Sequence, residues 1–458
     1  MRGVFASCAI AALLLALTLA FPDPTDNGHS RDTILMRSRR HGHGHSHDNG
    51  HGHSHDNGHG HSHGGGQGQD HDSTHRYHHP PGEDYDHSGD KTSQILFKPN
   101  TEFAAQFYKN LKAHTTAGEN IMFSPCTIAL SLSMLLAGAE HDTYNQMRDV
   151  LHYNIPSLNK TKINYAYEHI THMLFYHQDQ IALISALALG SGFELEKAYN
   201  DIIKHYYHGN TVKVDFAEQA EAVKQINTFI AQETKNKITD LLKEVDAETV
   251  MMLLSSMYYS GTWANSFDPS KTTKADFHVS ETKKVTVDMM QKNENLGFYE
   301  DNENHVTVVK THFTGNNSMI IVLPDEGKME EVEAKLDFAL IDHWRTSVSP
   351  KSVDLYLPRF SISADGKVGE LLKEMGMTNV FEDTAEFITI SKNKNLKLTQ
   401  MFHKDVLTIK EDGSGTATEV GDSLAVPVTL NRPFLFFILQ QDIKSFLFMG
   451  KLSDPTAN

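Results

Sequence analysis

Cysteine is nearly absent from this sequence, which has two cysteines, Cys8 and Cys126, among 458 residues. Cys8 lies in an apolar segment at the amino terminus that we expect to be removed, so the mature chain forms no internal disulfide. An exported protein without disulfides must be stabilised by a large hydrophobic core. Cys126 falls in an apolar run with helical spacing, which favours a buried structural thiol over a reactive or intermolecular one.

Long apolar runs are also scarce. The only one, Val4 to Ala20, follows Arg2 and precedes Pro22 and Pro24. A short apolar run behind a basic residue, with no comparable run later, is typical of a cleaved signal peptide rather than a membrane anchor. We therefore expect residues 1–20 to be a signal peptide, the protein to be secreted into the extracellular space, and the membrane not to be a partner.

Positive charge is in short supply. Lysine and arginine total 41 against 58 aspartate and glutamate residues, which gives a formal net charge of -17. Such a chain repels polyanions, so nucleic acid and acidic polysaccharide are excluded as main partners.

The motifs of an enzyme are missing as well. The scattered serine, histidine and aspartate residues match no nucleophile motif, and there is no glycine-rich phosphate loop. Histidines beyond residue 90 lack metal-ligand spacing, so His152, His169, His172 and His177 are interpreted as surface residues. We expect no catalytic residues, no enzymatic activity and no obligatory cofactor.

Histidine, by contrast, is abundant at the amino-terminal end, where sixteen of the 29 histidines precede residue 90. Residues 41–64 repeat a His-Gly-His-Ser-His unit, and the whole segment 21–92 has too little apolar surface to offset its ordering entropy, which predicts a disordered tail. Imidazoles two residues apart on such a chain can gather around zinc, copper or another divalent ion; a low-complexity spacer without a selected ligand is the alternative. The candidate ligands are His41, His43, His45, His47, His51, His53, His55, His59, His61 and His63.

A basic site precedes the repeat. Arg37-Ser-Arg39-Arg40 resembles the recognition site of furin-type processing proteases, although a solvated basic patch reads the same way. Cleavage after Arg40 would expose His41-Gly42-His43, whose amine, two amides and imidazole form the square-planar nitrogen set that Cu(II) prefers.

From about Ser93 the pattern becomes that of a folded body. Ser124 and Pro125 supply an N-cap and a first-turn proline for an apolar helix over residues 128–139. Val223 to Ile230 show helical spacing, and the pattern predicts that this helix continues to Leu242. The sequence favours helices early in the body.

Strands are predicted later in the chain. Residues 251–259 and 319–323 are continuous apolar runs, as in strands covered on both faces, whereas Val353, Leu355 and Leu357 alternate with polar residues. Residues 402–409, 432–439 and 446–451 are further strands at the carboxyl-terminal end. Helices and strands in mixed order indicate an α+β protein.

Short motifs along the body stand in the order found in the serpins, and the chain resembles that family, above all its plasma antitrypsin-like group. The resemblance covers about residues 93–458 and implies three β-sheets, about nine helices, an exposed reactive loop, a monomer, and an extracellular serine protease as a partner. The helix over residues 163–177 lacks the basic cluster of heparin-activated serpins, so heparin is not expected to bind. The motifs are Asn120-Ile-Met-Phe-Ser-Pro125, Asn227-Thr-Phe-Ile230, Tyr258-Tyr-Ser-Gly-Thr-Trp263, Phe277-His-Val279, Leu323-Pro-Asp-Glu-Gly327, Leu357-Pro-Arg-Phe360 and Asn431-Arg-Pro-Phe434.

The resemblance assigns roles to several polar residues. Ser124, Thr127 and His403 match the polar shutter cluster beneath the central sheet, and Trp263 matches the tryptophan of the breach, where loop insertion begins. Ser255 stands where the family usually has an asparagine, whose amide bridges two strands. Whether or not Ser255 and a water replace that bridge, we expect the sheet-opening machinery to be relaxed.

The reactive loop departs further from the inhibitory pattern. Glu411, Gly413 and Ser414 fit the hinge, but the following residues are not the usual alanines, and Asp422 would meet a closing sheet as a charge. Seventeen residues, 414–430, separate Gly413 from Asn431. Inhibitory serpins have about twenty-two there, so at about 3.3 Å per residue the loop is short by roughly 16 Å.

The shortened loop leaves no normal position for cleavage by a protease. Counted from Asn431 the scissile residue is Asp422, and counted from the hinge it is Pro427. Leu424-Ala425 is the best compromise, and we expect cleavage there as ordinary substrate turnover. Two functions therefore remain: a weakly or non-inhibitory binding and metal-carrying protein, or a suicide-substrate inhibitor.

Two sequence motifs predict glycosylation of an exported chain. Asn159-Lys-Thr161 and Asn316-Asn-Ser318 both fit the acceptor pattern for N-linked glycans. The protein is therefore expected to be a glycoprotein.

Overall fold

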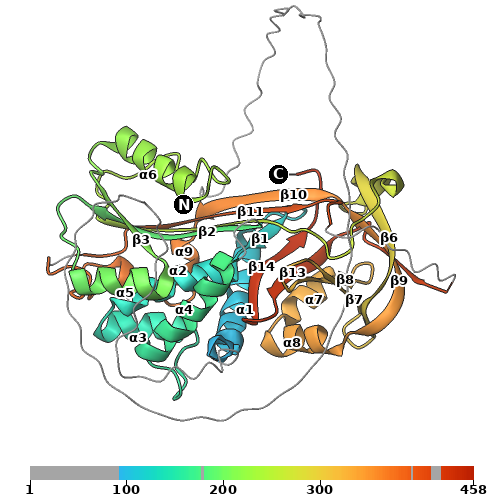
Figure 1. Ribbon diagram of the computed structural model, residues 1–458, viewed down its shortest axis with the longest axis horizontal. Helices are drawn as coiled ribbons and strands as arrows, with labels where there is room; N and C mark the ends of the chain where they lie inside the picture. Colours follow the sequence, from blue (N-terminus) through green and yellow to red (C-terminus); the bar gives the residue numbers. More distant parts are fainter. Residues whose placement is uncertain (1–91, 177–179, 394–395, 414–423, 458) are drawn as a thin grey trace, which may run out of the picture. The chain divides into compact units, whose positions relative to one another are not determined.

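The computed structural model describes residues 92–176, 180–393, 396–413 and 424–457, and every structural statement below refers to these residues. They form nine α-helices and fourteen strands (Figure 1). The helices are α1 (Phe97–His114), α2 (Pro125–Ala137), α3 (His141–Val150), α4 (Lys160–Tyr176), α5 (Lys197–Tyr207), α6 (Gln219–Glu233), α7 (Met329–Lys335), α8 (Phe338–Ser347) and α9 (Gly369–Glu374), with short 3-10 turns at Ser93–Leu96, Pro269–Lys271 and Asn379–Phe381. The strands are β1 (Ile121–Phe123), β2 (Ile181–Gly190), β3 (Asn210–Val214), β4 (Met251–Ser260), β5 (Thr273–His278), β6 (Lys284–Asp301), β7 (Val306–His312), β8 (Asn317–Pro324), β9 (Ser349–Pro358), β10 (Phe360–Lys367), β11 (Gln400–Ile409), β12 (Val426–Thr429), β13 (Phe434–Gln440) and β14 (Ser445–Leu452).

One sheet has five strands in the order β10-β11-β4-β2-β3, and both of its faces are covered. Helix α6 lies over β2 and β3 on one face, and α2 packs against the other (Figure 1). Alternate residues of β4 serve the two faces: Met252 and Leu254 pack toward α6, whereas Leu253 and Met257 join the main core. Burial on both faces explains the continuous apolar run of this strand and confirms that prediction.

The other sheet has nine strands, in the order β1-β14-β13-β8-β7-β6-β9-β12 with β5 also paired to β6. Strand β6 is 18 residues long. Its first residues pair with β5 and its last with β7, while β9 runs beside its middle. The described strands thus form two hydrogen-bonded sheets, since β6 joins two halves that the resemblance counts as separate sheets. The expected α+β fold is confirmed.

Helix α6 ends earlier than the sequence pattern predicts. The helix stops at Glu233, not at Leu242, because Lys235 and Asn236 adopt positive φ values of 50° and 59°. The hydroxyl of Thr234 donates to the carbonyl of Ile230 and accepts from the backbone N–H of Ile238, which satisfies the chain as it leaves the helix. The apolar residues beyond the helix are buried in irregular structure, so the prediction of a continuous helix was wrong.

Cys126 is buried in α2, as its apolar surroundings predicted. Burial raises the pKa of its thiol to about 11, so the thiolate is scarce at neutral pH and the residue is unreactive. No helix among the described residues is long and apolar enough to cross a bilayer.

Candidate functional site at the β4–β11 seam

The two central strands of the five-stranded sheet, β11 and β4, run parallel to each other. Their register extends from Gln400 opposite Met252 to Thr408 opposite Ser260, whereas β10 pairs with β11 and β2 with β4 in antiparallel fashion. A strand placed between β11 and β4 could run antiparallel to both, which is the favoured pairing. We call this contact the seam.

The chain that leaves β11 is tied to the end of the seam. Gly413 forms a bridge with Trp263, and the backbone N–H of Trp263 donates to the carbonyl of Asp412 at 3.0 Å. A Cβ atom on Gly413 would lie 2.5 Å from the Cα of Ser266, so only glycine fits this approach. The hinge predicted at Gly413 therefore begins as a docked segment.

Glu411 is buried beside the hinge. Its carboxylate accepts a hydrogen bond from the hydroxyl of Thr272 at 3.0 Å and lies 3.6 Å from the guanidinium of Arg359. Its carbonyl accepts from the backbone N–H of Phe267 at 3.1 Å. These contacts hold the chain in place immediately before the reactive loop.

Trp263 lies beyond the Ser260 end of the seam and is fully buried. Its ring stacks on Phe313 with centroids 4.1 Å apart, and its indole N–H donates to the carbonyl of Lys410 at 2.6 Å. The ammonium of Lys292 lies 4.9 Å from the same ring and 2.8 Å from the carboxylate of Glu294. Burial lowers the pKa of Lys292, and Glu294 opposes that shift. No sequence signal marked Lys292.

The predicted shutter residues lie together at the middle of the seam. Ser124 is the N-cap of α2, and its hydroxyl accepts from the backbone N–H of Thr127 at 3.2 Å. His403 of β11 places its Nδ1 atom 3.1 Å from the hydroxyl of Ser255 on β4. The serine that replaces the family's usual asparagine therefore contacts His403 directly across the seam.

Asp405 contacts the same cluster, although no motif in the sequence marked it. It is fully buried; its Oδ1 atom accepts from the backbone N–H of Met257 at 2.9 Å, and its Oδ2 atom lies 2.5 Å from Nε2 of His403. A signal did exist, because Asp405 is a charged residue in the inward phase of β11, between the buried residues His403 and Leu407.

Both ring nitrogens of His403 have polar partners. Nε2 lies 2.5 Å from the carboxylate of Asp405, and Nδ1 lies 3.1 Å from the hydroxyl of Ser255. The backbone N–H of Ser124 donates to Nε2 at 3.4 Å. Serine, histidine and aspartate are linked in the order seen in hydrolases, but all three are buried in the sheet, so substrate cannot reach the Ser255 hydroxyl.

The loop itself is described only at its two ends. Ser414 and Asp422 lie outside the described residues. Leu424 is 84% exposed, and Ala425 directly precedes β12, which pairs with β9 from Val426 onward. The peptide bond expected to be cut therefore stands at the surface, next to a strand that anchors the chain.

The two predicted glycosylation sites are exposed. The side-chain oxygen of Asn159 accepts from the backbone N–H of Lys162 at 2.9 Å at the start of α4. Asn316 lies in a turn with a φ of 56° and donates to Asp442 at 2.6 Å. Both asparagines are accessible, and their modification stays a prediction.

The predicted metal and processing residues, from Arg37, Arg39 and Arg40 to His63, all lie outside the described residues, as does His177. The described part of the chain holds no group of three or more metal-ligating side chains. His152 is bonded to Gln106 at 3.1 Å and His169 to Ser93 at 2.9 Å, while His172 is exposed.

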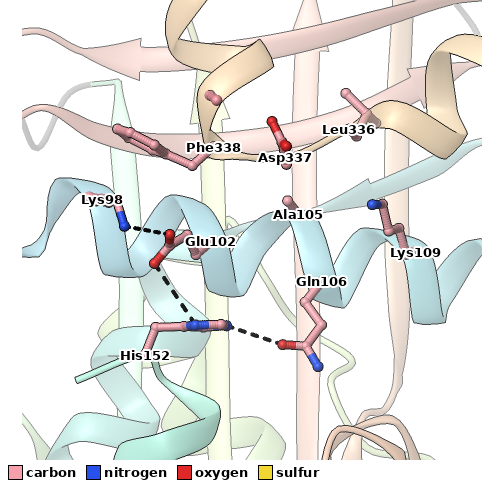
Figure 2. A pocket seen from close by; sticks show the side chains of 10 residues that line it. Lys98, Glu102, Ala105, Gln106, Lys109, His152, Leu336, Asp337 and Phe338 are labelled. Atoms are coloured by element: carbon pink, nitrogen blue, oxygen red, sulfur yellow. Dashed lines mark hydrogen bonds and ion pairs between the residues drawn. The ribbon is translucent and has the colours of Figure 1, made fainter. Parts of the chain in front are cut away.

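A cleft of about 510 Å³ lies between α1 and the start of α8. Figure 2 shows Lys98 and Glu102 of α1 joined by an ion pair of 2.7 Å, with Phe338 facing them and His152 on the other side of Glu102. Side chains of both charges thus line one wall of the cleft, and apolar side chains contribute to the rest of its lining. The lining residues are Lys98, Glu102, Ala105, Gln106, Lys109, His152, Leu336, Asp337, Phe338 and Ala339.

Comparison with known proteins agrees with this geometry. A family model described as Serpin (serine protease inhibitor) matches residues 98–455. An alpha-1-antitrypsin homolog from Cyprinus carpio is 38% identical over 69% of this chain and 86% of its own length, and human corticosteroid-binding globulin is 32% identical over 79% and 90%. The crystal structure of human thyroxine-binding globulin complexed with its ligand has a TM-score of 0.75 at 30% identity and covers 80% of this chain and 100% of its own.

Proposed function

Because this chain belongs to the serpin family, we propose that it acts as a secreted, weakly or non-inhibitory serpin, an extracellular binding protein of the plasma type with a metal-binding tail. The observation that carries the first part is the short span between the two anchored ends of the reactive loop. Gly413 is held at Trp263, and β12 is held on β9 from Val426. Only residues 414–425 connect these anchors.

The length of a strand that could enter the seam follows from these anchors. If the loop were cut after Leu424, residues 414–424 would be free to move. About three of them are needed to pass from the level of Trp263 to that of Ser260, where the seam begins, which leaves about eight for a seam of nine register pairs. An acylated protease would then stop at the far end of the seam and would not be pulled beyond it. Its active site would stay intact and hydrolyse the acyl bond.

The sequence of the loop supports the same conclusion. Glu419 and Asp422 would enter a sheet that is covered on both faces, and an unpaired carboxylate is costly to bury. The seam itself is already closed by the backbone ladder and by the polar contacts of the shutter. Insertion should therefore be slow as well as short.

Thermal unfolding of the cleaved protein tests this part of the proposal. An elastase- or chymotrypsin-like protease should cut between Leu424 and Ala425, and the cut protein should melt only a few degrees above the intact one, because a short strand adds little to the sheet. Mass spectrometry locates the cut. A cleaved form that resists heat far beyond the intact protein would contradict the proposal, since that requires a full inserted strand.

For ligand binding we propose the cleft between α1 and α8. Its volume of about 510 Å³ lies in the range of small-molecule sites. Phe338 offers an apolar surface, and Lys98, Glu102 and Gln106 offer polar contacts, which suits a small amphipathic molecule. Two relatives, human corticosteroid-binding globulin and human thyroxine-binding globulin, are by name carriers of such molecules. Tryptophan-quenching titrations with a steroid and an iodothyronine test the cleft, with Phe338→Asp as the variant expected to lose binding.

For the tail we propose binding of several Zn²⁺ or Cu²⁺ ions through deprotonated histidines. Calorimetry of the full protein should show more than one site, and deletion of residues 41–64 should remove most of the heat. Mild acid should release the metal, because each imidazole must be neutral to bind and its ordinary pKa is about 6.5. Equal binding after the deletion would refute a metal-binding tail.

Processing after Arg40 is part of the same proposal and is tested separately. Amino-terminal sequencing of the secreted protein should find a form that begins at His41, which would carry the additional copper site. A single terminus near Phe21 would exclude that site and leave the repeat intact.

The second candidate function is suicide-substrate inhibition of an extracellular serine protease. The hinge favours it, because Gly413 is docked at Trp263, where insertion would begin, and Glu411 is held by the backbone N–H of Phe267. Human alpha-1-antichymotrypsin, 32% identical over 79% of this chain, favours it as well. A covalent complex with a protease would distinguish this candidate from the first.

A further inference from the structure

Three consecutive register pairs of the seam are joined by side chains as well as by the backbone. At the first pair, the Ser255 hydroxyl meets Nδ1 of His403. At the second, the Ser256 hydroxyl donates to the carbonyl of Lys404. At the third, the backbone N–H of Met257 donates to the carboxylate of Asp405 at 2.9 Å. The polar contacts are therefore concentrated in the middle of the seam, where two strands would have to part.

Asp405 connects two of these three contacts. Ser255 and Met257 belong to β4, and His403 and Asp405 belong to β11, so the hydrogen bonds run from β4 to β11, along β11, and back to β4. This chain of four residues crosses the seam twice. Asp405 also holds the ring of His403 through Nε2, and the same ring makes the Nδ1 contact with Ser255. Loss of Asp405 would weaken both crossings.

An added strand would break this chain at Asp405. Neighbouring strands lie about 4.8 Å apart, so a strand placed between β4 and β11 would roughly double their separation and carry the N–H of Met257 out of reach of the carboxylate. Asp405 is fully buried and would then keep only His403 as a partner. A buried carboxylate that loses a donor is strongly disfavoured, so the closed seam is favoured over the open one.

We propose that Asp405 is a positioning residue that locks β4 against β11 and thereby sets the resistance of the sheet to an added strand. Asp405 thereby supplies a connection between β4 and β11 that the Ser255 side chain alone cannot provide. This inference rests on the proposed function only in that both concern the same seam. A lock at Asp405 can be present or absent whether or not the loop is long enough to inhibit a protease.

The test measures how fast the sheet accepts a strand from solution. The probe is a fluorescein-labelled peptide with the sequence of residues 414–424, and its incorporation is followed by fluorescence anisotropy and native gels. We expect Asp405→Ala to take up the peptide at least tenfold faster than the wild-type protein. Asp405→Asn should stay within about threefold of wild type, because its amide can still accept from Met257 and donate to His403. Asp405→Val replaces the alanine variant if that variant does not fold.

The control is Asp301→Ala, which removes another buried carboxylate far from the seam. Asp301 lies at the end of β6 in the nine-stranded sheet and accepts from the indole N–H of Trp344 at 3.0 Å. We expect this variant to lower the melting temperature without faster uptake of the peptide. Equal uptake by wild type and Asp405→Ala would overturn the inference, as would equal acceleration in Asp301→Ala. Neither result depends on whether a protease complex forms.

Discussion

Strand β4 has a neighbour on each side, and the two contacts are built differently. Toward β2 its partners are mostly apolar, as where Leu253 faces Leu187, and Ser185, which stands opposite Ser255, is bonded instead to Ser131 of α2 at 2.8 Å. Toward β11 the contact carries the polar chain centred on Asp405. Apolar packing between β4 and β2 stabilises the folded protein without depending on any single hydrogen bond. The polar contacts between β4 and β11 require particular partners, so they specify which strand lies beside β4. The two sides of one strand can therefore control different properties of the protein.

The largest expected effect comes from the apolar side. Leu187 is fully buried in the main core. Leu187→Ala should lower the free energy of unfolding by about 2–5 kcal/mol, because it leaves a cavity. Chemical denaturation gives this value. Amide exchange at Met257 should change only as much as the global stability does; a larger, selective change there would show that the two contacts of β4 are not independent.

On the β11 side of β4, we expect a smaller loss of global stability and a larger local change in hydrogen exchange. Asp405→Ala leaves the N–H of Met257 without its acceptor, so we expect a loss of about 1–3 kcal/mol in the free energy of unfolding. Hydrogen exchange at Met257 should accelerate by more than that loss explains, while amides of β2 follow global unfolding. Uniform acceleration across the sheet would make Asp405 an ordinary core residue.

Trp263 tests the end of the β4–β11 contact at which the hinge is docked. Trp263→Phe keeps the stacking on Phe313 and removes the donor to the carbonyl of Lys410, at a cost of about 1 kcal/mol. The released hinge should then be cut faster by trypsin after Lys410. Unchanged proteolysis at that site would mean that the indole hydrogen bond does not hold the hinge.

A helical region away from both contacts gives the smallest effect. Burial and the neighbouring His172 and His205 lower the pKa of His208, so below pH about 6.5 the unfolded chain binds the proton more readily than the folded one. The contribution of neutral His208 to the stability of the folded state is therefore complete above that pH, and it is lost as the pH falls through the pKa of His208 in the folded protein. His208→Asn, which tolerates the positive φ at this position, should flatten the acid limb of the stability curve by a few tenths of a kcal/mol. An unchanged acid limb would refute this assignment.

The sequence predicted the fold well because its signals are local. Alternation and apolar runs marked β4, β8 and β9, and Ser124 with Pro125 marked the start of α2. The end of α6 was missed, because positive φ values at Lys235 and Asn236 and a side-chain bond of Thr234 do not alter the apolar spacing.

The candidate site was predicted only in part. The resemblance placed Ser124, Thr127, Ser255 and His403 together, and the structure brings them together. The resemblance assigned no role to Asp405 or Lys292; Asp405 accepts from the backbone N–H of Met257, and Lys292 lies 4.9 Å from the ring of Trp263. Of these two, only Asp405 left a trace, as a charge in the inward phase of β11.

A non-inhibitory reactive loop is best tested by incubating the purified protein with a panel of serine proteases, read on denaturing gels beside an inhibitory serpin. We expect cleavage between Leu424 and Ala425, full release of active protease, and no covalent complex at any ratio of the two proteins. A complex that survives denaturation with any serine protease would contradict this expectation, because such a complex forms only if the loop inserts far enough to distort the acyl-enzyme.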